Sequence, residues 1–526
     1  MKSMKIRGVC AAVMGALLFG FGANAMADAT TDAVKGLVDG GMLTPEAADV
    51  VNRGHDKDVA AVKAAPKSID FMNDDAPFKT NFSIGDHKGD FQFYGVIDIG
   101  AVTTNHSLPT NGQLPNQFYP YQNTAAANGS QSGWNQGGLQ DSRFGFKGGI
   151  DLFHAADNNV KFIFQLESGF NPLNGSLNDA AKTLSQNPSK GQNNTWADSS
   201  LNGELFARQA WGGVDADKLG KLTFGVQYNP FFNIFAAYDP TNKADTFSPF
   251  GESGTVGGGG GVSEDARMKN SIKYANGFDV AGGKLTGSAI YQFGNASGDM
   301  SKGYGLGLQA GYETDMFGIQ VAYDKFEDAI AASTGSSYGQ INGSLYNTEA
   351  TLVALKFTPN KEWKFKGGWE WYERQTASDP SLNYGSLWGY TLSAPLSSGY
   401  TSGDYRDYNV LFAGAEYNFS ERFPQLNGLT LAVGYYDTIT EAKVTASTGA
   451  QGVNSATTAN GTGTEGTWTA VLDYTLNKRF DVYAAATHNH FTGAALLSGG
   501  DIHSTTVGNY GQSNIDAFGL GVRMKF

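Results

Sequence analysis

Residues 91–99, FQFYGVIDI, place apolar residues or glycine at every odd position and Gln92, Tyr94 and Asp98 at even positions. Because successive side chains of a β-strand point to opposite faces, this segment has one apolar and one polar face. The same two-residue period recurs in residues 160–167, 362–371 and 518–526. Such strands separate an apolar medium from an aqueous one, as in a soluble sandwich or a membrane barrel.

The composition of the whole chain agrees with an all-β fold. Its 526 residues include 70 Gly, 34 Phe and 24 Tyr, and only 17% are charged. This composition is too aromatic for a disordered chain and too poor in charge for a typical helical enzyme. Beyond the N-terminus no run of about 18 apolar residues occurs, which excludes a bundle of membrane helices. The formal net charge of −13 argues against a nucleic-acid partner, whose phosphates bind basic surfaces.

The first 27 residues have the pattern of a signal peptide. Basic residues precede an apolar stretch at residues 9–21, and small residues at 25–27 form a cleavage site. We therefore expect an exported protein. The single cysteine, Cys10, lies inside this segment, so the mature chain has no thiol for disulfides, metal binding or catalysis.

Residues 28–90 differ from the rest of the chain. Val34, Leu37 and Val38 recur at helical spacing, and Thr44 precedes a proline at a second helix start. We expect two short helices and then a linker, which together form a helical extension on the periplasmic side. It is either a surface hairpin of helices or an anchor or partner-binding motif.

Loop lengths distinguish the barrel from the sandwich. About 16 alternating segments follow from residue 91, each near the roughly ten residues of a tilted membrane strand. The connections between them mostly alternate between short and long. An up-and-down barrel has tight turns on one side and long loops on the other, whereas a sandwich has no reason to sort its loops. We therefore predict a transmembrane antiparallel β-barrel of about 16 strands over residues 91–526.

Several segments resemble a known family in their order and spacing. They are DSRFGFKG at 141–148, FIFQLESGF at 162–170, FARQAW at 206–211, LTFGVQY at 222–228 and RMKNSIKY at 267–274. They resemble strands two to six of the Gram-negative trimeric general diffusion porins, and the terminal Phe526 resembles their outer-membrane assembly signal. The resemblance covers residues 91–526. It implies a homotrimer in outer-membrane lipid, with passive water-filled channels for ions and small hydrophilic solutes.

The resemblance also implies a constriction, where the third loop, residues 229–265, folds into the lumen and its acids face a basic wall. The implied wall residues are Arg143, Lys147, Arg208, Arg267 and Lys269, and the implied acids are Asp239, Asp245 and Glu252. Parity within the strands independently points all the wall residues except Arg208 inward, and it points Met268 outward. Where many relatives have a subunit-contact arginine, this chain has Val226, which parity places outward together with Tyr228.

Other functions have weaker support in the sequence. No nucleophile elbow or zinc-protease motif occurs, so we expect neither enzyme activity nor a cofactor. His488 and His490 share one face of a strand, but two imidazoles make an incomplete metal site. A solute-specific channel and an adhesin that uses the long outer loops are the alternatives. Because the basic wall opposes an acidic chain, we expect weak ion selectivity without predicting its sign.

Overall fold

The computed structural model describes residues 78–109, 122–123, 129–155, 158–173, 175, 177, 205–206, 208–251, 266–294, 303–331, 344–375, 386–387, 390–391, 405–444, 459–493 and 514–526. The predicted signal peptide, the two predicted N-terminal helices and the candidate acid Glu252 lie outside these residues.

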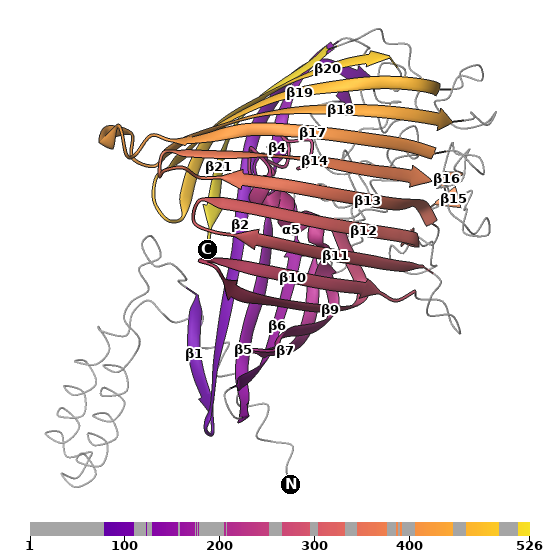
Figure 1. The fold of residues 1–526 in the computed structure, drawn as a ribbon. Helices are drawn as coiled ribbons and strands as arrows, with labels where there is room; N and C mark the ends of the chain where they lie inside the picture. Colours follow the sequence, from indigo (N-terminus) through magenta and orange to yellow (C-terminus); the bar gives the residue numbers. More distant parts are fainter. Residues whose placement is uncertain are drawn as a thin grey trace, which may run out of the picture. The chain divides into compact units, whose positions relative to one another are not determined.

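The strands form an antiparallel sheet that closes into a barrel (Figure 1). In chain order they are β2 (His87–Pro109), β4 (Gly129–Gln136), β5 (Arg143–Ala155), β6 (Asn158–Gly169), β7 (Gln209–Ala216), β8 (Gly220–Tyr228), β9 (Arg267–Val280), β10 (Gly283–Gln292), β11 (Tyr304–Glu313), β12 (Phe317–Ala331), β13 (Ser344–Phe357), β14 (Trp363–Gln375), β17 (Tyr405–Asn418), β18 (Leu429–Val444), β19 (Ala459–Thr475), β20 (Phe480–Gly493) and β21 (Asn514–Lys525). Because β4 and β5 share one position, the barrel has 16 strands, which confirms the predicted architecture. Three two-residue strands are additional: β3 (Gln122–Asn123), β15 (Ser386–Leu387) and β16 (Tyr390–Thr391).

The long strand β2 closes the barrel. One of its edges pairs with β21 along residues 96–104. Its other edge pairs with β5 along residues 89–96 and with β4 further on. A short strand, β1 (Lys79–Ile84), pairs with the beginning of β2. The predicted linker therefore ends before residue 90, because these residues already form a β-hairpin.

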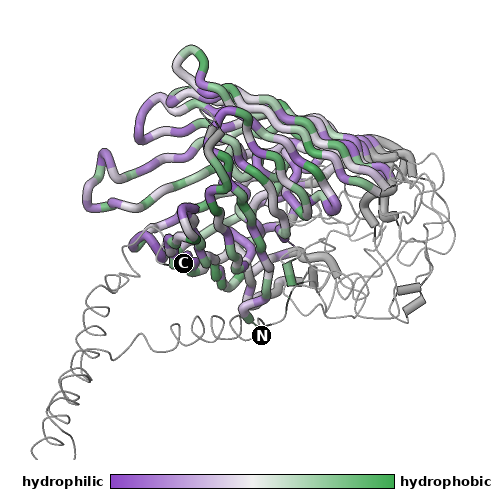
Figure 2. The backbone as a smooth tube through the Cα atoms, turned by 90° about the horizontal axis from the view of Figure 1, so that it is seen from below, coloured by the Kyte–Doolittle hydropathy of each residue, from purple (hydrophilic) through white to green (hydrophobic). Residues whose placement is uncertain are grey.

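The outward face of the strands is apolar, as the alternation predicts. Large side chains on this face are exposed, and five of them are 36% to 54% exposed: Phe224, Leu308, Trp369, Leu411 and Phe518. The inward face buries charged groups, among them Asp98, Asp324, Glu370 and Arg523. Hydrophobic and hydrophilic residues alternate along the strands in Figure 2. This sorting suits a barrel in a lipid bilayer, whose wall meets hydrocarbon outside and polar groups inside.

The second position of the barrel is interrupted between β4 and β5. Residues 137–142, which we term the inward segment, leave the ladder and turn into the lumen. Asp98 on β2 accepts a hydrogen bond from the backbone N–H of Leu139 at 3.0 Å. A Cβ atom at Gly138 would lie 2.0 Å from the Tyr483 hydroxyl oxygen, so a larger residue has no room there. The inward segment is thereby fixed against the wall.

A bulge between β8 and β9 changes which face nearby residues occupy. Gly225 has a φ of 131° and Asn270 a φ of 47°, and the register of the two strands shifts here. Tyr228 consequently points inward and donates its hydroxyl hydrogen to Glu167, while Met268 is fully buried. The predictions of Tyr228 and Met268 as outward residues are wrong, because strict alternation cannot anticipate a bulge.

One helix, α5 (Pro230–Tyr238), lies inside the barrel at the start of the third loop (Figure 1). The Asn229 side chain caps it by accepting the N–H of Phe232 at 2.9 Å, and proline at the first helical position suits the free N-terminus. The helix contacts β11, β12 and β13 on the inner wall. In the described part of the chain, no helix is long and apolar enough to cross a membrane.

Candidate channel constriction

The third loop packs on one half of the inner wall through an aromatic core. Phe235 of α5 stacks on Phe250 with their ring centroids 4.0 Å apart. Phe250 in turn meets Phe412 on β17 at 4.9 Å and Tyr436 on β18 at 5.5 Å, both edge to face. Each large apolar side chain buried in this way stabilises the docked loop by about 1.5 to 3 kcal/mol. We term this half, from β11 to β19, the docking wall.

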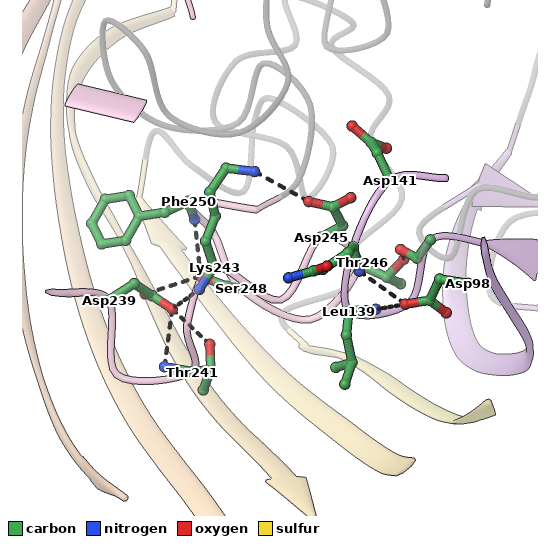
Figure 3. Close-up of polar contacts among 12 residues, drawn as sticks. Asp98, Leu139, Asp141, Asp239, Thr241, Lys243, Asp245, Thr246, Ser248 and Phe250 are labelled. Atoms are coloured by element: carbon green, nitrogen blue, oxygen red, sulfur yellow. Dashed lines mark hydrogen bonds and ion pairs between the residues drawn. The ribbon is translucent and has the colours of Figure 1, made fainter. Parts of the chain in front are cut away.

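Asp239 organises the turn that follows α5. Its fully buried carboxylate accepts the backbone N–H groups of Thr241 at 2.9 Å and Lys243 at 2.7 Å (Figure 3). It also accepts hydroxyl hydrogens from Thr241, Ser248 and, at 2.6 Å, Tyr436 of the docking wall. This candidate acid therefore holds the loop in shape and fastens it to the wall, and its burial keeps it from facing lumen water.

The tip of the third loop reaches the inward segment. The N–H of Asp245 donates to the carbonyl of Leu139 at 3.3 Å, and the N–H of Thr246 donates to that of Gly138 at 3.1 Å. The Asn135 amide on β4 donates to the Thr246 hydroxyl at 2.6 Å. The loop is thus held at both ends, by the docking wall and by the inward segment, and it narrows the lumen between them.

Two carboxyl groups meet where the loop tip touches the inward segment (Figure 3). Asp245 lies 3.1 Å from the Lys243 ammonium, and Asp141 lies 2.7 Å from the Arg208 guanidinium. Burial and the neighbouring Asp141 carboxylate raise the pKa of Asp245 well above its usual range. Burial acts in the same direction on Asp141, but the charges of Arg208 and Lys243 outweigh it and lower that pKa to about 2. Asp245 therefore keeps its proton at pH values where an ordinary aspartic acid is ionised.

Arg208 is the centre of a buried ion-pair network on the opposite side of the lumen. Only 2% of its side chain is exposed. Its guanidinium donates to Glu167 at 3.0 Å, to Asp141 at 2.7 Å and to the Tyr228 hydroxyl at 2.9 Å. Because Arg208 is surrounded by two carboxylates, its charge is compensated within the wall. We term the half from β2 to β9 the polar wall.

Arg143 and Lys147 lie on the same face of β5 in the polar wall, four residues or about 13 Å apart along the strand. Arg143 is 23% exposed, lies 3.6 Å from Glu167 and donates to the backbone carbonyl of Asp141 at 3.0 Å. Lys147 is exposed, and its ammonium lies 5.1 Å from the centre of the Tyr94 ring. Among the five basic candidates, Lys147 is the most exposed.

Arg267 and Lys269 occupy the start of β9. Arg267 is buried, with its guanidinium over the rings of Tyr228 at 5.1 Å and Phe232 at 5.8 Å. Lys269 is half-buried, and its backbone N–H donates to the Gln292 side chain. The sequence groups the five bases as one wall, but the structure divides them into a buried pair, Arg208 and Arg267, and three more accessible residues.

Several residues of this region were not predicted as site residues from the sequence. Glu167, Tyr94 and Gln165 form a hydrogen-bonded chain, in which Gln165 donates to the Tyr94 hydroxyl at 2.6 Å and that hydroxyl donates to Glu167 at 2.9 Å. Their inward parity is readable from the alternation, but their contacts across 71 and 73 residues of chain are not. Lys243 carried no signal, since a lysine in a long polar loop is usual.

The two histidines noted in the sequence lie on the outward face, away from this region. His488 pairs with Asp516, and His490 with Asn514 at 2.8 Å. Within the described ranges, no group of three or more His, Cys, Asp or Glu side chains is arranged to hold a metal ion.

Comparisons with known proteins agree with this architecture. The model of the Gram-negative porin family matches residues 59–494. An outer membrane porin protein of Bordetella pertussis is 24% identical over 295 residues, which are 52% of this chain and 65% of the relative. The match thus spans just under two thirds of the length of that relative.

A solved porin structure shares the fold at low sequence identity. An anion-selective porin from Comamonas acidovorans has a TM-score of 0.51 at 13% identity, with 83% of this chain and 100% of that chain aligned. OmpT of Vibrio cholerae, in a trimer form, has a TM-score of 0.48 at 13% identity, with 83% and 99% aligned.

Proposed function

This chain belongs to the Gram-negative porin family, and we propose that it forms a water-filled outer-membrane channel for the passive diffusion of ions and small hydrophilic solutes. The observation that carries this proposal is the closed barrel, whose lumen is narrowed by the docked third loop. In the part that the structure describes, no sheet or plug domain crosses this lumen. Export by the signal peptide at residues 1–27 would bring the chain to that membrane.

We further propose that the channel prefers anions. The loop acids Asp239 and Asp245 are buried and hydrogen-bonded, whereas Lys147 of the polar wall is exposed. Among the candidate constriction residues that the structure describes, the most exposed charge is therefore positive. The neighbouring fold from Comamonas acidovorans is an anion-selective porin, which supports the same sign.

Planar-bilayer recording tests both proposals. Purified protein should give stepwise conductance, and the reversal potential in a salt gradient should have the sign of an anion-preferring pore. Protein that inserts without conductance steps would refute the channel, and a cation-signed potential would refute the preference while leaving the channel intact.

We propose that the barrel assembles as a homotrimer through the outward face of β18 to β21, β2 and β4. A groove of 590 Å³ lies on this face, with small residues Thr103, Ala470 and Ala486 in its lining. The pair His488 and Asp516 also lines it, with side chains 49% and 44% exposed. Ionisable groups facing lipid are unfavourable, so a second copy that covers them explains their position. This face lies away from Val226.

Filling the groove tests the assembly. Ala486→Trp should convert the trimer to monomers in native mass spectrometry or chemical cross-linking, because it places a large ring where the partner packs. Leu308→Trp on the outward face of β11 is the matched control and should leave the trimer intact. If Ala486→Trp remains trimeric, the contact between subunits lies on another face of the barrel.

A further inference from the structure

A row of polar and aromatic residues crosses the polar wall at one height. The register pairs Gln92 with Lys147, Lys147 with Gln165, and Gln165 with Trp211, so all four side chains point into the lumen. Trp211 is half-buried, and its indole N–H donates to Gln209 at 3.0 Å. The sequence reasoning assigned no role to this tryptophan.

Glycine occupies two of the inward positions next to Trp211. Its register partner on β8 is Gly225, and the next inward residue on its own strand is Gly213. The backbone leaves no room for a Cβ at either glycine, since it would lie 2.1 Å from a carbonyl oxygen in both cases. No side chain therefore stands beside the indole at these two positions, whereas most wall positions carry one.

The charge of Lys147 lies over a second aromatic ring, that of Tyr94. Tyr94 is held through its hydroxyl by Gln165 and Glu167, and the Lys147 ammonium lies over its ring at 5.1 Å. Lys147 and Trp211 sit two strands apart, about 10 Å between backbones at the usual strand spacing. An exposed lysine and a half-buried indole thus point into the lumen at a separation that one small molecule can span.

We propose that Lys147, Tyr94 and Trp211 form a binding site for aromatic carboxylates, which the channel takes up in preference to aliphatic anions of the same size. The solute's carboxylate pairs with the Lys147 ammonium, and its ring packs on Trp211 and Tyr94. A charge-assisted hydrogen bond supplies orientation, and offset ring packing supplies the distinction between aromatic and aliphatic solutes.

The site rests on the proposed channel function and refines it. A general pore needs only the field of Lys147, whereas the aromatic pair beside it adds a contact that a simple ion cannot use. The affinity must stay modest, because a solute that binds tightly would not leave the channel. We therefore expect a dissociation constant in the millimolar range. A value of 1 mM corresponds to a binding free energy of about −4 kcal/mol.

Blocking of the ion current by added solutes tests this inference on the intact protein. Benzoate should reduce the chloride current of single channels at about three- to tenfold lower concentration than cyclohexanecarboxylate, which has the same charge and nearly the same size. Benzamide, which keeps the ring but lacks the charge, should block far less than benzoate. Equal potency of benzoate and cyclohexanecarboxylate would overturn the aromatic site and leave the channel and its anion preference standing.

Two variants locate the site. Lys147→Met should abolish the block by both carboxylates, and Trp211→Leu should bring benzoate to the potency of cyclohexanecarboxylate. Lys161→Met is the control for charge, because Lys161 lies inward on β6 about 13 Å from the row, four residues along the strand. Trp369→Leu is the control for the indole, because Trp369 lies on the outward face. A preference for benzoate over cyclohexanecarboxylate that survives Trp211→Leu would refute the location of the site at Trp211. The comparison of the two solutes on the unmodified protein tests the aromatic preference even if a variant fails to insert.

Discussion

The two halves of the lumen wall are built differently, although their strands alternate in the same way. The docking wall turns aromatic side chains inward, and Phe412 and Tyr436 bury the third loop against it. The polar wall turns ion pairs inward, with Arg208 at their centre. An inward position therefore does not mean contact with water, because the loop converts half of the lumen wall into a protein core.

Removing the carboxylate that fastens the loop should have the largest effect. Asp239→Ala leaves buried N–H and hydroxyl donors without their acceptor, so we expect a loss of about 3 to 5 kcal/mol and a loop released from the docking wall. Single-channel conductance should rise and its noise increase, and heat-induced unfolding of the barrel in detergent should move to lower temperature. Asp279→Ala, at an exposed position near the end of β9, should change neither; an unchanged channel in Asp239→Ala would contradict the anchoring role.

Removing the positive charge at the centre of the polar wall should also destabilise the barrel. Arg208→Met should strand Glu167 and Asp141 as buried carboxylates and cost about 3 kcal/mol or more. Adding Glu167→Gln to Arg208→Met should recover part of that loss, because the uncompensated charge is removed. Both variants are compared by denaturant unfolding in detergent micelles. Additive losses in the double variant would show that the pair does not interact.

The contact between the loop tip and the inward segment should respond to pH. Because the pKa of Asp245 is raised in the folded channel, its contribution is complete below the ordinary value of 3.8 and is lost as the pH rises through the raised value. Asp141, with its pKa lowered to about 2, contributes above 3.8 and loses its effect as the pH falls toward 2. Current noise should therefore grow as the pH is raised through the elevated pKa of Asp245.

Asp245→Asn separates this effect from other titrations. The amide resembles the protonated acid but cannot ionise, so the noise should stay low and flat across the same pH range. Asp217→Asn, an exposed aspartate in the turn between β7 and β8, should behave like the unmodified protein. A pH response that persists in Asp245→Asn would place the titrating group elsewhere.

The smallest expected effect distinguishes exposed from buried bases. Lys147→Gln should shift the reversal potential toward cations by several millivolts, since its charge faces water within a Debye length of passing ions, about 8 Å in physiological salt. Arg143→Gln should shift the reversal potential less, because Glu167 partly compensates the charge of Arg143. Equal shifts would mean that burial does not screen these charges, and the distinction between the two residues would fail.

The alternation predicted the barrel, its strand number and the inward direction of Arg143 and Lys147. It failed at the bulge near Gly225, where Tyr228 turns inward, and it did not reveal the inward segment, which follows the ordinary strand β4. Neither feature has a two-residue period. The candidate acids of the loop came from a resemblance, and the pattern carries no information about which of them are buried.

The sequence by itself determined the medium on each side of the wall, because the direction of a side chain in a strand depends only on its position in the chain. The tertiary structure alone decided which charges face water. Burial and ion pairing depend on partners far away in sequence: Tyr436 binds Asp239 across 197 residues, and Arg208 binds Asp141 across 67. Charge in the lumen is therefore set by which groups the docked loop and the closed barrel bring together.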